Sequence, residues 1–309
     1  MLSLNIKNET SRLRAVVLGT AVNNGPTPDA KNAYDPKSLE HILAGTYPHE
    51  SDMRDEMEAF NSVFKKYDVK VFRPQIIADE NQIFTRDIAF VIDDIFIEAG
   101  ILPERDKEFP AIQHVVDQID PAKFVRIEDK EKIHIEGGDV ILWNEYIFIG
   151  TYKSGDYPQI KTARTNQAGI DFVANLFPHK KILTFDLQKS WNDAHDNALH
   201  LDCCFQPVGT NKAIIYKEGF RNPAEYQQLV DLFGIENLHH ITRDEMYNMN
   251  SNVFSISPEV VVSGNNLQQF GRLNDWLRAN GFTVEEIPYS EISKQEGLLR
   301  CSTLPLIRD

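Results

Sequence analysis

Cysteine is scarce in this sequence, which has three among 309 residues. Two of them, Cys203 and Cys204, are adjacent, and the third, Cys301, lies near the end of the chain. Cysteines in this arrangement cannot form a disulfide framework and are typical of a reducing compartment. We therefore expect a cytoplasmic protein in which at least one thiol is free.

Long apolar runs are also missing. No stretch reaches the ~18 uninterrupted apolar residues of a membrane helix, and residues 1–14 lack the apolar run of a signal peptide. These absences predict a soluble, unexported protein without a membrane partner. With 42% hydrophobic residues, the chain can bury a sizeable core, in one large domain or two of ordinary size.

Basic residues are outnumbered, since 32 Lys and Arg face 46 Asp and Glu and give a formal net charge of -14. Binding to a phosphate backbone requires clustered Lys and Arg, so nucleic acid is not an expected partner. An acidic field attracts cationic small molecules, although many cytosolic proteins are acidic for solubility alone. The positions of the carboxylates are therefore more informative about function than the total charge.

An internal repeat runs through the chain. Two short β-rich runs, separated by a polar or Gly/Pro turn, follow a polar cluster and precede a helical segment and a single strand. This ββαβ unit occurs about five times along the chain. The clearest copies begin at Phe84, Ile135, Leu199 and Asn252.

Three of the helical segments have clear signals. One is predicted to begin with Asn222 as its cap and Pro223 in its first turn, to have a capping box completed by Glu225, and to end at Gly234. Two others have apolar residues at helical spacing, which we interpret as core-facing stripes: Met53, Met57, Phe60 and Phe64, and Leu267, Phe270, Leu273 and Leu277.

The two ends of the chain complete the repeat. The first unit has one early strand at 13–18, and the tail at 299–306 supplies an unpartnered strand. Pairing the two closes a ring of about five units, with the helices outside and equivalent strand ends around one axis. This predicts one α/β domain over residues 1–309, whose units end in single strands at 69–72, 124–127, 182–185, 239–241 and 283–287.

Polar clusters open these units, and ring closure would bring them together. A spacing of two residues on a strand would place His200 and Asp202 on one face, and Gly137-Gly138 would let a ligand approach the backbone. Taken alone, a cysteine, a histidine or an aspartate is more often a structural residue than a functional one. Their equivalent positions in the repeat indicate a site formed by Arg86-Asp87, Glu136-Gly137-Gly138-Asp139, His200-Leu201-Asp202 and Cys301.

Metal binding is the rival use of His200 and Asp202, which could be joined as ligands by Cys203 and Cys204. Adjacent cysteines do not form the usual chelate with a two-residue gap, and successive strand residues point to opposite faces. We therefore predict no metal site and interpret Cys203 and Cys204 as packing residues, one on each face.

A guanidinium group matches this set of residues. The group is planar and cationic with five donors, so it is complemented by clustered carboxylates. Its central carbon is stabilised by resonance, so attack requires a strong nucleophile such as a thiolate and an acid for the leaving amine. Cys301 and His200 suit those two roles, and the available carboxylates are Asp87, Glu136, Asp139 and Asp202.

At these residues the sequence resembles the guanidine-modifying enzyme superfamily, which has the pentein fold and includes arginine deiminases, dimethylarginine hydrolases and amidinotransferases. The resemblance runs nearly end to end. It implies a five-bladed α/β propeller, a covalent S-alkylthiouronium intermediate and no cofactor. It is carried by Phe84-Thr85-Arg86-Asp87, Glu136-Gly137-Gly138-Asp139, His200-Leu201-Asp202 and Cys301-Ser302-Thr303-Leu304-Pro305-Leu306-Ile307-Arg308.

The resemblance also implies roles. Cys301 would be the nucleophile, and His200 the acid and then the base. Glu136 would orient His200 or hold the substrate. Asp87 and Asp202 would bind the guanidinium nitrogens.

Two further residues complete the implied site. Asp139 would support the carboxylates, and Arg105 lies where deiminases carry a carboxylate-binding arginine, although a plain surface charge is equally consistent. The loop at 296–301 lacks the glycine-rich, arginine-bearing stretch of deiminases, so arginine itself is not singled out. The run at 199–208, with its double cysteine, is similar to a bacterial subgroup that hydrolyses citrulline, which implies a ureido target.

The leading hypothesis is hydrolysis of a guanidino or ureido carbon–nitrogen bond of a small cationic or ureido amino acid resembling arginine. An amidinotransferase, in which an amine resolves the intermediate, is the alternative, because the resolving nucleophile depends on loop access. A noncatalytic binding module is a third hypothesis, since a translation factor uses the same ring, but the intact Cys, His and carboxylate set opposes it. A papain-like protease would carry its cysteine ahead of its histidine. The sequence predicts no oligomeric state.

Overall fold

The computed structural model describes residues 1–309 and contains five three-stranded sheets. Each sheet joins an antiparallel pair to a parallel third strand. The strands, sheet by sheet, are β15 (Thr303–Arg308), β1 (Leu13–Leu18) and β2 (Lys70–Phe72); β3 (Ala89–Ile92), β4 (Ile95–Glu98) and β5 (Phe124–Arg126); β6 (Val140–Trp143), β7 (Tyr146–Thr151) and β8 (Lys181–Asp186); β9 (Phe205–Val208), β10 (Lys212–Ile215) and β11 (Leu238–His240); and β12 (Phe254–Ser257), β13 (Val260–Gly264) and β14 (Thr283–Ile287). These are the predicted ββαβ units.

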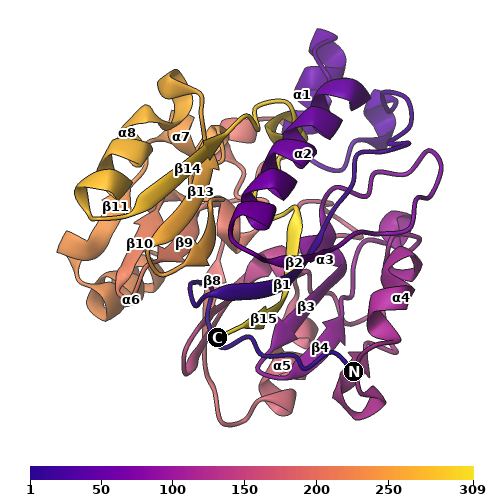
Figure 1. Ribbon diagram of the computed structural model, residues 1–309, viewed down its shortest axis with the longest axis horizontal. Helices are drawn as coiled ribbons and strands as arrows, with labels where there is room; N and C mark the ends of the chain where they lie inside the picture. Colours follow the sequence, from indigo (N-terminus) through magenta and orange to yellow (C-terminus); the bar gives the residue numbers. More distant parts are fainter.

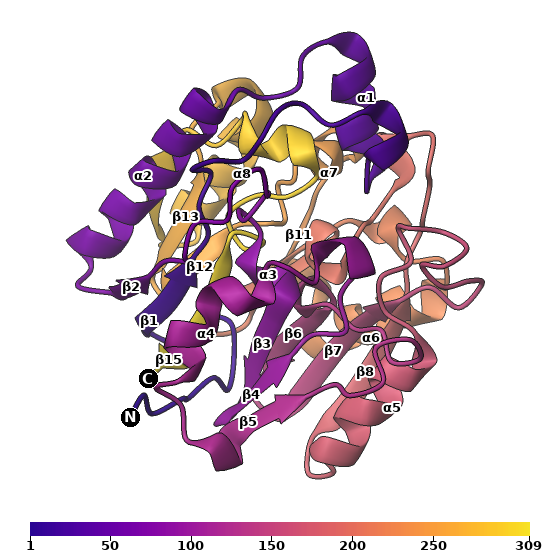
Figure 2. The ribbon, with the colours of Figure 1, turned by 90° about the vertical axis from the view of Figure 1, so that its right-hand side faces the viewer.

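The longer helices lie at the periphery of the sheets (Figure 1). Seen from the side, α2 lies over β1 and β2, and α1 lies above the sheets formed by β3 to β8 (Figure 2). No helix combines the length and apolar character needed to cross a membrane. The helices are α1 (Pro36–Ala44), α2 (Glu50–Lys66), α3 (Thr85–Ile88), α4 (Gln113–Val116), α5 (Gln167–Leu176), α6 (Pro223–Phe233), α7 (Arg243–Tyr247) and α8 (Leu267–Ala279).

The two ends of the chain meet, as the sequence predicts. Strand β1 pairs antiparallel with β15, with Leu18 opposite Thr303 and Val16 opposite Pro305, and Asn5 of the N-terminal segment forms a further bridge with Ile307 of β15. β15 begins later than the predicted 299–306, because residues 299–302 form turns. Those turns carry Cys301. The predicted closing strands at 69–72, 124–127, 182–185, 239–241 and 283–287 are confirmed to within one residue at each end.

Two details of the predicted helices are wrong. Asn222 caps α6 by accepting from Ala224 N, but Glu225 does not complete a capping box. It is turned toward β8, where it accepts hydrogen bonds from Asp186 N at 2.6 Å and Lys153 Nζ at 2.8 Å. Leu267 is 76% exposed, because it is the first residue of α8 after the cap and lies beyond the core.

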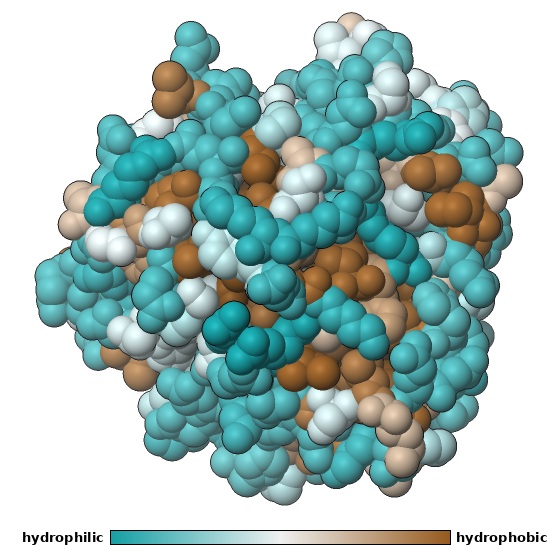
Figure 3. Space-filling model, in the orientation of Figure 1, coloured by the Kyte–Doolittle hydropathy of each residue, from teal (hydrophilic) through white to brown (hydrophobic).

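The apolar stripes otherwise form the core. The stripe of α2 is buried, and the ring of Phe60 lies edge-on to Phe254 and Tyr289 with centroids 5.8 and 5.7 Å apart. Such aromatic contacts add stability beyond the area they bury. They hold α2 against β12 and against the segment that follows β14. The outer face seen in Figure 3 is largely hydrophilic, with apolar side chains in its recesses.

Candidate active site

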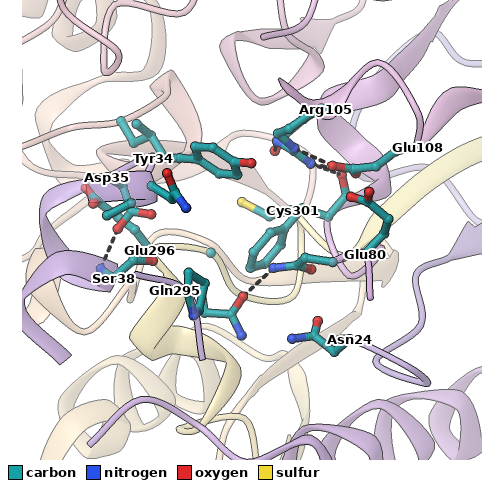
Figure 4. A pocket seen from close by; sticks show the side chains of 18 of the residues that line it. Asn24, Tyr34, Asp35, Ser38, Glu80, Arg105, Glu108, Gln295, Glu296 and Cys301 are labelled. Atoms are coloured by element: carbon teal, nitrogen blue, oxygen red, sulfur yellow. Dashed lines mark hydrogen bonds and ion pairs between the residues drawn. The ribbon is translucent and has the colours of Figure 1, made fainter. Parts of the chain in front are cut away.

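A cavity of about 540 Å³ brings together four of the predicted site residues, namely Asp87, Arg105, His200 and Cys301. Cys301, His200 and Asp87, which are remote along the chain, all line it, together with residues 24–47 from the segment that includes α1. In Figure 4 the sulfur of Cys301 points into the space between Tyr34 and Arg105. The convergence expected from ring closure is therefore present.

Short helical turns, not strands, carry the polar clusters into this region. They are α3, which contains Asp87, and two 3-10 turns at Gly137–Asp139 and Leu201–Cys203. The prediction that His200 and Asp202 share one face of a strand is therefore wrong, because the chain turns between them. His200 faces the cavity, and Asp202 faces the protein interior.

Gly138 makes room for the side chain of His200 and Gly137 for the backbone near Arg86, and neither glycine lines the cavity. A Cβ on Gly138 would lie 2.5 Å from Nδ1 of His200, and a Cβ on Gly137 would lie 2.1 Å from the carbonyl oxygen of Arg86. Both distances are far inside van der Waals contact. Glycine is thus required for the turns to pack against each other and for the imidazole to reach its place.

His200 lies between two carboxylates. Its Nε2 is 2.9 Å from Oε2 of Glu136, and its Nδ1 is 3.8 Å from Oδ1 of Asp87. Burial opposes a charge on the imidazole, but Asp87 and the hydrogen bond with Glu136 outweigh it, so the pKa of His200 is raised. The imidazolium form, which is the form of a general acid, is favoured.

Glu136 is completely buried and does not line the cavity. Its Oε2 also accepts a hydrogen bond from Nη1 of Arg164 at 3.0 Å. Burial would raise the pKa of Glu136, but Arg164 and His200 lower it to about 2. Of the two roles considered for Glu136, the geometry favours orienting His200. The sequence motifs did not identify Arg164, which lies in a buried polar run before α5 that has no pattern of its own.

Cys301 is held by Asn252. The Asn252 Oδ1 accepts from Cys301 N at 3.1 Å, and its Nδ2 lies 3.2 Å from the sulfur. Burial and the charges of Asp202 and Asp87 hold the pKa of the Cys301 thiol well above its ordinary value. Asn252 was missed as a site residue, although it opens one of the repeated hairpins and so occupies an equivalent position.

Asp202 is not among the residues that line the cavity. Its Oδ2 accepts from Nη1 of Arg300 at 2.8 Å and lies 3.7 Å from the Cys301 sulfur. Arg300 is fully buried and binds Glu9 with its other nitrogens. Asp202 is therefore part of the support behind the nucleophile.

Asp139 is likewise a supporting residue. Its Oδ1 accepts from Leu201 N at 3.0 Å and its Oδ2 from Thr165 Oγ1 at 2.6 Å. These bonds fix the turn that follows His200.

Arg105 lies in the cavity wall but is already paired. It donates to Asp87 Oδ2 at 2.8 Å and to both oxygens of Glu108, at 2.6 and 2.9 Å. It is therefore not free to bind a carboxylate as expected from the resemblance. The other oxygen of Asp87, Oδ1, is buried without a hydrogen-bond partner and is available to a donor.

The possible metal ligands differ from those that the sequence suggested. Asp87, Glu136 and His200 each offer an atom within 4.8 Å of the others, so these three could hold an ion. Arg105 and Arg164 already place positive charge beside the two carboxylates. Cys203 and Cys204 are buried and free. They lie in and just after a 3-10 turn, not on the two faces of a strand as predicted.

Five ββαβ units around a cavity that holds a cysteine, a histidine and carboxylates define the guanidine-modifying enzymes of the pentein fold. Residues 32–308 match the family described as N,N dimethylarginine dimethylhydrolase, eukaryotic. The chain belongs to this family. The superfamily and the fold predicted from the sequence are thereby confirmed.

Two relatives illustrate the range of sequence similarity. YkgA of Bacillus subtilis (strain 168), described as uncharacterized, is 30% identical over 228 residues, which are 74% of this chain and 70% of YkgA. An arginine deiminase of Bacillus cereus (strain B4264) is 27% identical over 273 residues. That match covers 74% of this chain but 62% of the deiminase, so the chain spans less than two thirds of it.

Two solved structures share the fold. SxtG, an amidinotransferase of Microseira wollei from the saxitoxin biosynthetic pathway, superposes with a TM-score of 0.75 at 16% identity, over 99% of this chain and 97% of SxtG. The N-terminal domain of ArgZ, an arginine dihydrolase of Cyanobacteria, superposes with a TM-score of 0.75 at 15% identity, over 95% of this chain and 98% of that domain. At these identities the likeness concerns the fold alone.

Proposed function

We propose that this protein, as one catalytic domain, hydrolyses a guanidino or ureido carbon–nitrogen bond of a small arginine-like compound through a covalent intermediate on Cys301. The observation that carries the proposal is the cavity that Cys301, His200 and Asp87 line together, with one Asp87 oxygen unpartnered. A planar group bound to that oxygen would lie beside both the thiol and the imidazole.

The first half-reaction begins with a neutral thiol. Burial raises the pKa of Cys301, and the charges of Asp202 and Asp87 raise it further, so a cation bound at Asp87 offsets part of that rise and favours the thiolate. The thiol proton passes to solvent. The thiolate attacks the central carbon, the carbon–nitrogen bond breaks, and the His200 imidazolium gives its proton to the leaving nitrogen.

The second half-reaction uses the same imidazole in its neutral form. It takes a proton from a water molecule that attacks the carbon bound to sulfur, and the carbon–sulfur bond breaks to release the product and the thiolate. Glu136 and Arg164 hold His200 in place throughout. A ureido substrate would follow the same steps with an oxygen in place of one guanidino nitrogen.

The comparisons support this proposal in outline. The domain of ArgZ has been captured covalently bound to a reaction intermediate, and the family that matches this chain is described as a hydrolase of methylated arginine. Both are in line with a covalent hydrolytic route. We propose the same route here on the evidence of the site.

A turnover screen tests the proposal. Arginine, methylarginines, aminobutylguanidine and citrulline are incubated with the protein, and released ammonia or amine is measured. We expect release from at least one compound without an added acceptor, and none with Cys301→Ala. Full activity of Cys301→Ala would exclude the mechanism. A noncatalytic binding module would release nothing from any compound.

The match to SxtG over nearly the whole of both chains favours an amidinotransferase as the second candidate. In that reaction an amine, not water, attacks the intermediate. Product formation that requires an added amine would then replace hydrolysis.

A further inference from the structure

Asn252 contacts the sulfur of Cys301 without taking part in the cavity wall. It lies just before β12, has no exposed surface and is not among the residues that line the cavity. Its Nδ2 is 3.2 Å from the sulfur. Asn252 therefore touches the nucleophile but not the space that a substrate would fill.

The orientation of the Asn252 amide is fixed by its neighbours. Its Oδ1 accepts from Cys301 N at 3.1 Å, and an amide nitrogen in that place would meet a second donor. On the other side, Nδ2 approaches the carbonyl oxygen of Asp202 at 3.5 Å, which is an acceptor. The amide must therefore turn an N–H group, not its oxygen, toward the sulfur.

The backbone of Asn252 is tied to the same turn as its side chain. Its carbonyl oxygen accepts from Arg300 N at 3.3 Å, next to the bond that its Oδ1 accepts from Cys301 N. Bonds to two consecutive residues of the turn at 299–302 keep the donor at a fixed place beside the sulfur.

This donor opposes the other influences on the thiol. Burial and the charges of Asp202 and Asp87 hold the pKa of Cys301 well above its ordinary value, whereas hydrogen bonds from the backbone of Leu298 and the amide of Asn252 lower it. Asn252 thus supplies a side-chain donor that favours the thiolate where burial and two carboxylates disfavour it.

A fixed donor at the sulfur acts at two steps of the proposed reaction. Before attack, the thiol loses its proton and the sulfur becomes negatively charged. In the second half-reaction, the carbon–sulfur bond breaks and its electron pair returns to the sulfur. Because Cys301 is buried, a donor already aimed at this atom stabilises the charge without rearrangement.

From this geometry we infer that Asn252 is a further catalytic residue, whose Nδ2 donates a hydrogen bond to the Cys301 thiolate in both half-reactions. The inference rests on the proposed function and deepens it, and it holds whether water or an amine resolves the intermediate. The alternative is a purely structural role, in which Asn252 only holds the turn through the bond from Cys301 N.

Alkylation of the resting protein tests the donor apart from turnover. Iodoacetamide is added at neutral and alkaline pH, and modified Cys301 is quantified by peptide mass spectrometry. Asn252→Asp keeps an oxygen that accepts from Cys301 N but loses the amide donor, and Asn252→Ala removes both without adding charge. We expect alkylation of both variants to slow by about three- to tenfold, because the higher nucleophilicity of a more basic thiolate offsets part of the loss of thiolate.

Turnover gives a second readout, on each compound of the screen that the parent protein hydrolyses. We expect both variants to lower kcat by about 100-fold, as for the loss of one preorganised donor. KM should stay nearly unchanged, because Asn252 does not line the cavity.

The matched control is Asn274→Asp in α8. Asn274 is also buried outside the cavity, and its Nδ2 donates to the carbonyl oxygen of Gly264 at 2.9 Å. This variant should be alkylated and turn over at the parent rates. A thermal melt checks that every variant is folded.

Alkylation at the parent rate in either folded Asn252 variant would overturn the inference. The parent rate in Asn252→Asp alone would show that Asn252 only holds the turn, and the parent rate in Asn252→Ala alone would assign the effect of Asn252→Asp to its added charge. In both cases turnover by the parent protein would leave the proposed function standing. If the parent protein turned over no compound, the catalytic role would fall with the proposed function, even if alkylation of both variants were slow.

Discussion

Nε2 of His200 lies 2.9 Å from Oε2 of Glu136, a carboxylate with no exposed surface. The hydrogen bond joins residues that are 64 positions apart and belong to neighbouring repeats. It stabilises the imidazolium against the cost of burial. In the proposed mechanism the imidazolium that this bond stabilises gives a proton to the leaving nitrogen.

The first prediction concerns Glu136→Gln. Loss of the negative charge lowers the pKa of His200, so the acid form is lost at a lower pH. We expect kcat to fall by roughly 100-fold or more, as for the loss of a general acid. The alkaline limb of the pH profile of kcat should move to lower pH. An unshifted limb would show that Glu136 does not set the charge of His200.

The second prediction concerns the thiol. Asp202→Asn removes a negative charge 3.7 Å from the sulfur, so the pKa of Cys301 should fall. We expect iodoacetamide to alkylate Cys301 faster at neutral pH than in the parent protein, with the modified residue identified by peptide mass spectrometry. Asp244→Asn, at an exposed position, is the control. Equal alkylation rates in all three proteins would contradict the electrostatic account.

The third prediction compares two glycines. Gly138→Ala places a Cβ 2.5 Å from the His200 ring, whereas a Cβ on Gly271 in α8 meets nothing within 4 Å. Gly138→Ala should reduce kcat and lower the free energy of unfolding by about 1–3 kcal/mol, as for overpacking. Gly271→Ala should raise it by up to about 1 kcal/mol, because alanine favours the helix. Urea unfolding measures both, and a fully active Gly138→Ala would contradict the packing described for His200.

Much of the fold could be predicted from the sequence because its signals are local. The hairpins that begin near Phe84, Ile135, Leu199 and Asn252 are marked by turn residues between β-rich runs, and β1 and β15 remained as the only unpartnered strands. The repeat then placed Asp87, His200 and Cys301 at equivalent positions, and all three line the cavity.

Side-chain partners were harder to predict. The prediction that His200 and Asp202 share one face of a strand was wrong because a 3-10 turn replaces the expected strand, and the Asp202 carboxylate accepts a hydrogen bond from Arg300. The sequence motifs did not identify Arg164, Asn252 or Arg300. Their hydrogen bonds depend on how turns that are distant along the chain pack together, and this packing cannot be predicted from residue spacing. Arg105 was placed correctly in the cavity, but its pairing with Glu108 depends on the local turn.

The central claim is that the sulfur of Cys301 bonds covalently to the substrate carbon. Intact-protein mass spectrometry after rapid acid quenching of the turnover mixture tests it most directly, followed by peptide mapping. We predict an adduct of amidino or ureido type on the peptide containing Cys301, and none in Cys301→Ala. Turnover without any such adduct on Cys301, and unchanged in Cys301→Ala, would contradict the account.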